Sequence, residues 1–64
     1  MLALSEEARR RVLEALREEA KGAAALAISR RAGLPLMDTI RVLEEMVREG
    51  LVERRGKTYR LLKA

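Results

Sequence analysis

The chain has 64 residues, a net charge of +4, and neither cysteine nor histidine. A disulfide framework and a thiolate metal site are therefore excluded, as are the commonest general base and the commonest metal ligand. No apolar run approaches the ~20 residues needed to cross a bilayer, and no secretion signal is present. The sequence predicts a cytoplasmic protein with no cofactor, no metal and no membrane partner.

Residues 1–64 are expected to form a single domain near the lower size limit for independent folding. Domains of this size bury only ~60% of the surface that their unfolded chain exposes. Apolar residues, 48% of the chain, offset that handicap. An amino-acid composition rich in Ala, Leu, Glu and Arg is typical of a thermophile protein or of an idealised designed sequence. It does not distinguish between these two origins.

A first helix is predicted over residues 6–21. Ser5 can cap it with its hydroxyl group, and apolar residues recur at helical spacing from Ala8 to Ala20. Lys21 followed by Gly22 is typical of a helix end, with a cation in the last turn and a residue that tolerates a left-handed backbone after it.

Two further helices are predicted, over residues 24–32 and 35–49. Gly33 ends the shorter one, and Pro35 suits the first turn of the next. In the third helix one face is expected to be buried, with Val42 at its edge. The residues of that face are Leu36, Thr39, Ile40, Leu43, Met46 and Val47.

The last segment reads as a β-hairpin over residues 51–62, with its turn at Arg55-Gly56-Lys57. An isolated two-stranded hairpin is marginal in water. Val52, Tyr59 and Leu61 are therefore expected to pack against the helices. The predicted fold class is mainly α with a C-terminal β-hairpin.

The positive charge lies in the second half of the chain. Residues 1–29 carry five basic and five acidic side chains, whereas residues 30–64 carry nine basic and five acidic ones. Such an excess suits a polyanionic partner. It is also within the net charge of ~2–8 that keeps small domains soluble. Charge alone therefore does not distinguish a surface for a polyanionic partner from an ordinary solvated surface.

Three short motifs occur in a fixed order. Ile28-Ser29-Arg30-Arg31-Ala32-Gly33-Leu34 forms a helix–turn step, Gly50-Leu51-Val52 leads out of the third helix, and Arg54-Arg55-Gly56-Lys57 follows in the hairpin. In this order and spacing, the sequence resembles the winged helix-turn-helix family, of the broad kind seen in ArsR- and MarR-type bacterial regulators. The resemblance covers about residues 6–62 and implies three helices plus a wing.

The resemblance implies a transcription-regulator-like module that binds double-stranded DNA and is associated with the nucleoid. The third helix would enter the major groove, where Arg41 can donate two hydrogen bonds to guanine. Family relatives often use the first helix at a dimer seam, so a homodimer is left open. The implied DNA-binding residues are Arg30, Arg31, Met37, Asp38, Arg41, Arg54, Arg55, Lys57, Thr58 and Arg60.

Several alternatives stand beside this interpretation. The hairpin turn could be an ordinary charged turn, and Arg41 a surface arginine paired with Asp38, Glu44 or Glu45. Core packing is expected for Leu36, Met37 and Ile40, since their exposure would indicate a protein partner. The alternative function is a protein-interaction or oligomerisation module that uses the apolar and acidic face of the third helix.

Catalysis is not expected. The sequence has no glycine-rich phosphate loop, and without histidine no Ser-His-Asp arrangement can form. No small-molecule site is evident.

Overall fold

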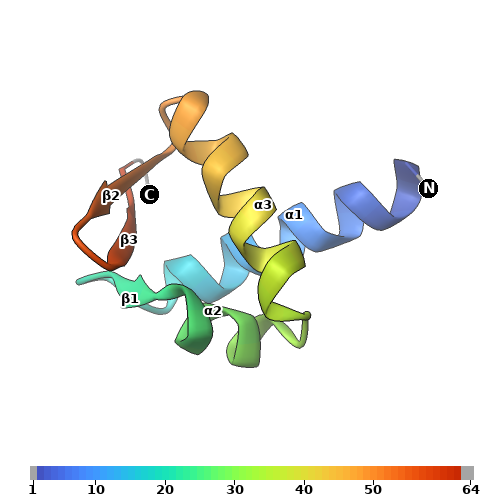
Figure 1. Cartoon of the computed structure of the whole chain (residues 1–64), viewed down its shortest axis with the longest axis horizontal. Coiled ribbons are helices and arrows are strands. Elements are labelled where there is room, and N and C mark those ends of the chain that lie inside the picture. The colour runs from blue at the N-terminus through green and yellow to red at the C-terminus, as the bar shows by residue number, and fades with distance from the viewer. Residues whose placement is uncertain (1, 63–64) are drawn as a thin grey trace.

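The computed structural model describes residues 2–62, with side chains from residue 6 onward. Three helices, α1 (Leu2–Arg17), α2 (Ala25–Ala32) and α3 (Leu36–Arg48), precede an antiparallel hairpin of β2 (Val52–Arg55) and β3 (Thr58–Leu61) (Figure 1). The predicted fold class, three helices followed by a C-terminal hairpin, is confirmed. A short strand that the sequence did not predict, β1 (Ala23–Ala24), joins the sheet.

The first helix differs from its prediction at both ends. It begins at Leu2 rather than at about residue 6, and the capping role expected of Ser5 lies outside the described side chains. It ends at Arg17 rather than at residue 21, because the backbone tightens into a turn in which the Glu18 N–H donates to the Ala15 carbonyl. This early exit lets Ala23 and Ala24 pair with β3.

Pairing with β3, rather than local propensity, makes β1 a strand. Ala23 lies opposite Tyr59 and Ala24 opposite Thr58, so the sheet order is β1-β3-β2. Alanine is a poor strand former, and two residues carry no alternating pattern. The wing is thereby attached to the connection between α1 and α2 as well as to α3.

Gly22 is the residue at which this connection is tightest. Its φ is +93°, and a Cβ there would lie 3.0 Å from the Tyr59 carbonyl oxygen and 3.3 Å from the Arg60 Cβ. At Gly50, with φ +81°, a Cβ would meet nothing within 4 Å. Only the first glycine therefore combines a left-handed backbone with a close neighbour.

Gly22→Ala is expected to destabilise the domain more than Gly50→Ala. Left-handed strain costs both variants roughly 1–2 kcal/mol, and the crowding against β3 adds roughly 1–3 kcal/mol at Gly22 alone. Urea unfolding of the two variants measures the difference. Equal losses of stability would show that β3 shifts to accommodate the added Cβ. In that case the close approach of the chain at Gly22 would add nothing to the cost of the substitution.

Every element except β1 contributes a buried side chain to one core. The largest fully buried apolar side chains are Val12, Leu16, Ile28, Leu43, Met46 and Val52. Tyr59 is buried as predicted, from β3, and Leu61 is half-buried against the core. The hairpin is thus held by the helices, which removes the marginal stability of an isolated one.

The buried face of α3 is rotated about the helix axis relative to the predicted face. Thr39, Val42, Leu43 and Met46 are buried, a spacing that repeats every three or four residues. Leu36 and Val47 are exposed and Ile40 is only partly buried, so the prediction for these residues was wrong. Thr39 can be fully buried because its hydroxyl donates to the Pro35 carbonyl, at 3.1 Å.

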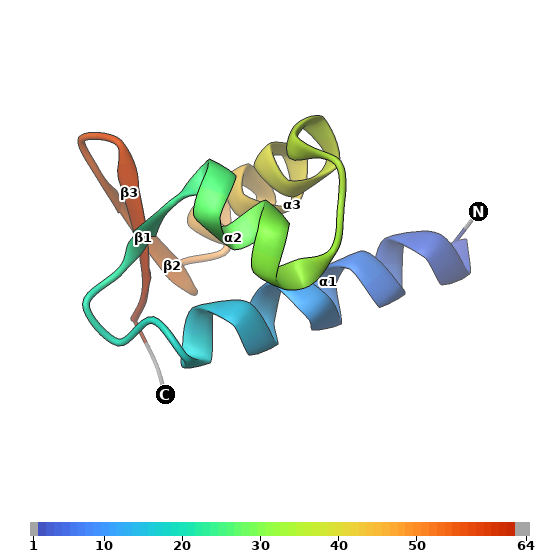
Figure 2. The same ribbon diagram turned by 90° about the horizontal axis from the view of Figure 1, so that it is seen from below.

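Two sides of the molecule can be distinguished. Seen from below, α1 runs along one side, while α2, α3 and the hairpin turn lie on the other (Figure 2). α3 packs against α1, α2 and β2 through its buried face. Its opposite face is left without any covering element of the described chain.

Candidate nucleic-acid interface

The outward face of α3 combines one apolar, two basic and one acidic side chain, the last being the exposed Glu44, seven residues from Met37. Helical spacing puts Met37, Arg41 and Arg48 opposite the buried stripe, and all three are exposed, Met37 at 66%. Within residues 6–62, where side chains are described, Arg41 makes no ion pair with Asp38, Glu44 or Glu45. Its guanidinium is available to a partner outside the chain.

Two of the four acids near α3 share one ion-pair partner on α1, Arg9. The Arg9 Nη2 lies 2.9 Å from the Glu49 Oε1, and its Nη1 lies 3.5 Å from the Glu45 Oε1. The hydrogen bond to Glu49 raises the pKa of the Arg9 guanidinium above its ordinary value. Glu45 and Glu49 are thus directed toward α1, whereas Glu44 is not. Asp38 and Glu44 remain exposed.

Strand register divides the cations of the hairpin between two faces. Directly opposed residues of an antiparallel pair project from the same face of the sheet. Arg54 lies opposite Tyr59, whose ring is buried, so Arg54 belongs to the face turned toward the helices. Arg55 opposite Thr58, and Glu53 opposite Arg60, belong to the outer face.

The outer face of the hairpin is partly self-neutralised. The Glu53 carboxylate accepts a hydrogen bond from Arg60 at 2.8 Å and lies 3.6 Å from the Arg55 Nε. Thr58 donates its hydroxyl hydrogen to the Arg55 carbonyl at 3.0 Å, which closes the turn. Arg54 and Lys57 make no ion pair with any side chain that the structure describes.

An open groove of about 640 Å³ separates the C-terminal half of α3 from the hairpin. Arg48 lines it from α3 and Arg54 from β2, and the carboxylates of Glu44 and Glu53 line it as well. The sequence-based selection of site residues left out Arg48. Its spacing of seven residues from Arg41, two helical turns on the same face, is the signal that would have included it.

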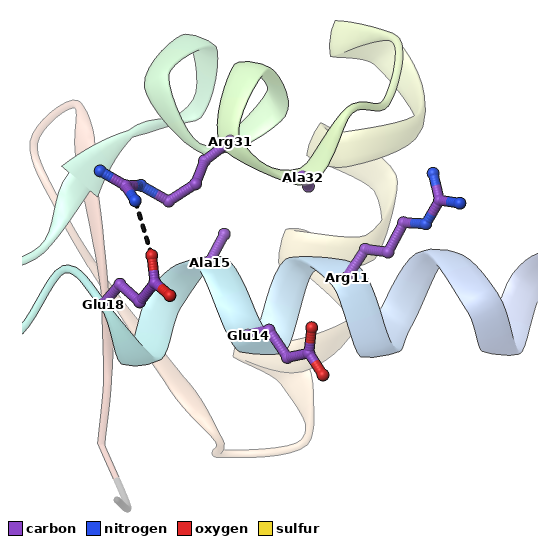
Figure 3. A pocket seen from close by; sticks show the side chains of 6 residues that line it. All are labelled: Arg11, Glu14, Ala15, Glu18, Arg31 and Ala32. Atoms are coloured by element: carbon purple, nitrogen blue, oxygen red, sulfur yellow. Dashed lines mark hydrogen bonds and ion pairs between the residues drawn. The ribbon is translucent and has the colours of Figure 1, made fainter.

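The two arginines of α2 have different surroundings. Arg31 points toward the turn that follows α1, where its Nη1 lies 2.6 Å from the Glu18 Oε1 (Figure 3). Its Nε also lies 3.1 Å from the Glu19 Oε2. This contact borders a shallow pocket of about 280 Å³ between α1 and α2, lined also by Arg11 and Glu14. Arg30 is exposed, and no ion pair joins it to the side chains of residues 6–62.

Comparison with protein families adds the deciding observation. Residues 11–56, well over half of the chain, match the IclR helix-turn-helix domain. The chain belongs to the IclR helix-turn-helix family. Neither the curated proteins nor the solved structures gave a significant match.

The IclR-type match begins within α1, includes α2 and α3, and ends at the turn of the hairpin. The winged helix-turn-helix assignment is confirmed, while the narrower likeness to ArsR- and MarR-type regulators is not supported. The domain is a DNA-binding, transcription-regulator module of a non-enzymatic family. Seven of the implied site residues, from Arg30 to Arg55, lie within the match, and Lys57, Thr58 and Arg60 follow it.

None of the helices that the structure describes is long and apolar enough to cross a membrane. No cluster of three or more Asp or Glu side chains in the described part of the chain has the geometry of a metal site.

Proposed function

We propose that this IclR-type domain binds double-stranded DNA by laying the outward face of α3 in the major groove and the hairpin against the phosphate backbone. Such a module would act in the cytoplasm, at the nucleoid. Arg41 would donate to a guanine edge, because its planar guanidinium can bond O6 and N7 together. Met37 and Asp38 would lie next to it, at the end of the helix that enters the groove.

The observation that carries this proposal is the arrangement of unpaired cations. Arg41 and Arg48 on α3, and Arg54 and Lys57 on the hairpin, lack ion-pair partners among residues 6–62. α3 and the turn of the hairpin lie on the side of the molecule away from α1 (Figure 2), while β3 also contacts α1. On α1, by contrast, Arg9, Arg10 and Arg11 are paired with carboxylates, and Arg17 alone has no ion-pair partner among residues 6–62.

The groove between α3 and the hairpin suits one phosphodiester strand. Arg48 and Arg54 line it from opposite elements, so a phosphate between them would receive two charge-assisted hydrogen bonds. Lys57 at the turn, and Arg55, Thr58 and Arg60 on the outer face, would reach the backbone on the far side of the wing. Arg30 would reach phosphates from α2.

Arg31 has a different role in this proposal. Its guanidinium is bound to Glu18 and Glu19, so it would hold α2 against α1 rather than contact a phosphate. A residue that positions α2 still affects DNA binding indirectly, because α2 packs on α3.

Fluorescence anisotropy of a labelled duplex tests the proposal. At low salt the domain should bind duplex DNA in general, with higher affinity for the sequences it reads, and binding should weaken as salt rises, since each neutralised phosphate releases condensed cations. A domain that fails to bind any duplex even at low salt would refute the proposal.

The exposed apolar side chains of α3 favour a second candidate, a protein-interaction or oligomerisation module. Leu36 and Met37 are exposed rather than packed in the core, and exposed apolar patches often mark protein partners. The acidic half of that surface is less accessible, because Arg9 occupies Glu45 and Glu49. This weakens the second candidate relative to the first.

A homodimer remains part of the proposal. If the domain is dimeric, its two half-sites should be separated by about one helical turn of DNA, ~34–36 Å. Sedimentation at micromolar concentration, with and without duplex, measures the stoichiometry.

A further inference from the structure

The first turn of α3 exposes apolar side chains that the fold does not use. Leu36 is 40% exposed and Met37 is 66% exposed. The core is closed without them, by Thr39, Val42, Leu43 and Met46 from the same helix. Met37 lies on the outward face, while Leu36 lies toward the flank, about 100° around the helix.

The chemistry of the major groove limits what these side chains can recognise. Neither Met37 nor Leu36 can donate a hydrogen bond, and a thioether is at best a weak acceptor. Guanine, cytosine and adenine present only donors and acceptors at the groove edge, whereas thymine also presents its C5-methyl group. Burial against that methyl is the one favourable contact a base offers to an apolar side chain.

We infer that Met37 reads the C5-methyl group of a thymine in the major groove. This inference rests on the proposed DNA-binding function and narrows it to duplexes with a thymine at a fixed distance from a guanine. The flexible, polarisable side chain of methionine adapts to the position of the methyl group.

Helical geometry gives the spacing between the two bases. Met37 and Arg41 are four residues apart on one face, so their Cα atoms are separated by ~6 Å along the axis. Bases on one strand are ~3.4 Å apart, so the thymine should lie about two base steps from the guanine that Arg41 contacts.

Selection from a randomised duplex pool, followed by replacement of thymine with uracil, tests the inference. Uracil pairs identically but lacks the methyl group. In duplexes enriched by the wild-type domain, uracil at one thymine position should weaken binding roughly fourfold, the effect of one buried methyl-sized group. The same replacement should have no effect on Met37→Ala.

Arg41→Ala serves as the matched variant. It should bind more weakly overall but keep the uracil penalty, because the thymine contact is made by another side chain. Met37 is exposed, so Met37→Ala is expected to fold, and thermal unfolding checks this. Loss of the penalty in Met37→Ala, together with its retention in Arg41→Ala, is the predicted pattern.

Three outcomes would overturn the inference. Enriched duplexes in which no thymine position is sensitive to uracil would refute thymine recognition while leaving the proposed DNA binding intact. A Met37→Ala variant that keeps its DNA affinity but changes its sedimentation would assign Met37 to a protein contact. A pool from which no duplex is retained at low salt would refute DNA binding, and the inference with it.

Discussion

Replacing Arg54, Arg55 and Lys57 by alanine should make DNA binding much less sensitive to salt. The three side chains are exposed at the hairpin turn, and each phosphate contact steepens the slope of log K against log salt by about 0.9. Losing three contacts should flatten the slope by about 2.7. Between 50 and 200 mM salt, the wild type should therefore lose roughly 40-fold more affinity than the variant. Anisotropy titrations at several salt concentrations measure both slopes.

A control of equal charge comes from the other side of the molecule. Arg10, Arg17 and Lys21 are exposed cations on α1 and on the turn after it, away from α3 and the hairpin turn. Their replacement by alanine removes the same three charges and should leave the slope close to that of the wild type. If both triple variants flattened the slope equally, net charge rather than the wing would explain the salt dependence.

Leu43→Ala should remove a large part of the stability of the domain. Leu43 is fully buried in the middle of α3, and Leu→Ala changes at such sites cost about 2–5 kcal/mol. A domain of this size has roughly 3–10 kcal/mol in total. The melting temperature should fall by at least ~10 °C, since each kcal/mol is worth about 4–8 °C in small domains. Thermal unfolding followed by circular dichroism measures the change.

Val47→Ala, one turn further along the same helix, is the matched comparison. Its side chain is 37% exposed, so the loss should stay below about 1 kcal/mol. The sequence-based prediction put both residues on the buried face, and the structure separates them. Comparable losses for the two variants would favour the predicted face over the observed one.

The positions of glycine and proline in the sequence were sufficient to predict the order of the helices and strands of the predicted fold. Gly33, Pro35 and Gly50 each have a local conformational role, and they divide α2, α3 and the hairpin close to the observed bounds. What could not be predicted depends on tertiary contacts. β1 exists because β3 lies beside it, and the rotation of α3 depends on which neighbours its faces meet.

The sequence predicted which segments form the candidate site, but not which of their charged side chains are free to contact DNA. A motif can place Arg30 and Arg31 together on α2, yet only the fold shows that Arg31 contacts Glu18 and Glu19 in the turn after α1. Likewise, Arg9 and Glu49 are distant in the sequence, and their ion pair removes an acid from the proposed interface. Flexible charged side chains find partners that sequence spacing does not reveal.

Amide chemical-shift mapping of the ¹⁵N-labelled domain, with unlabelled duplex added at low salt, tests directly which face binds DNA. The predicted perturbations concentrate at residues 37–41 of α3 and residues 54–58 of the hairpin, while residues 8–17 of α1 change little. Perturbations concentrated on α1, or none at all with a saturating duplex, would contradict the interface proposed for this IclR-type domain.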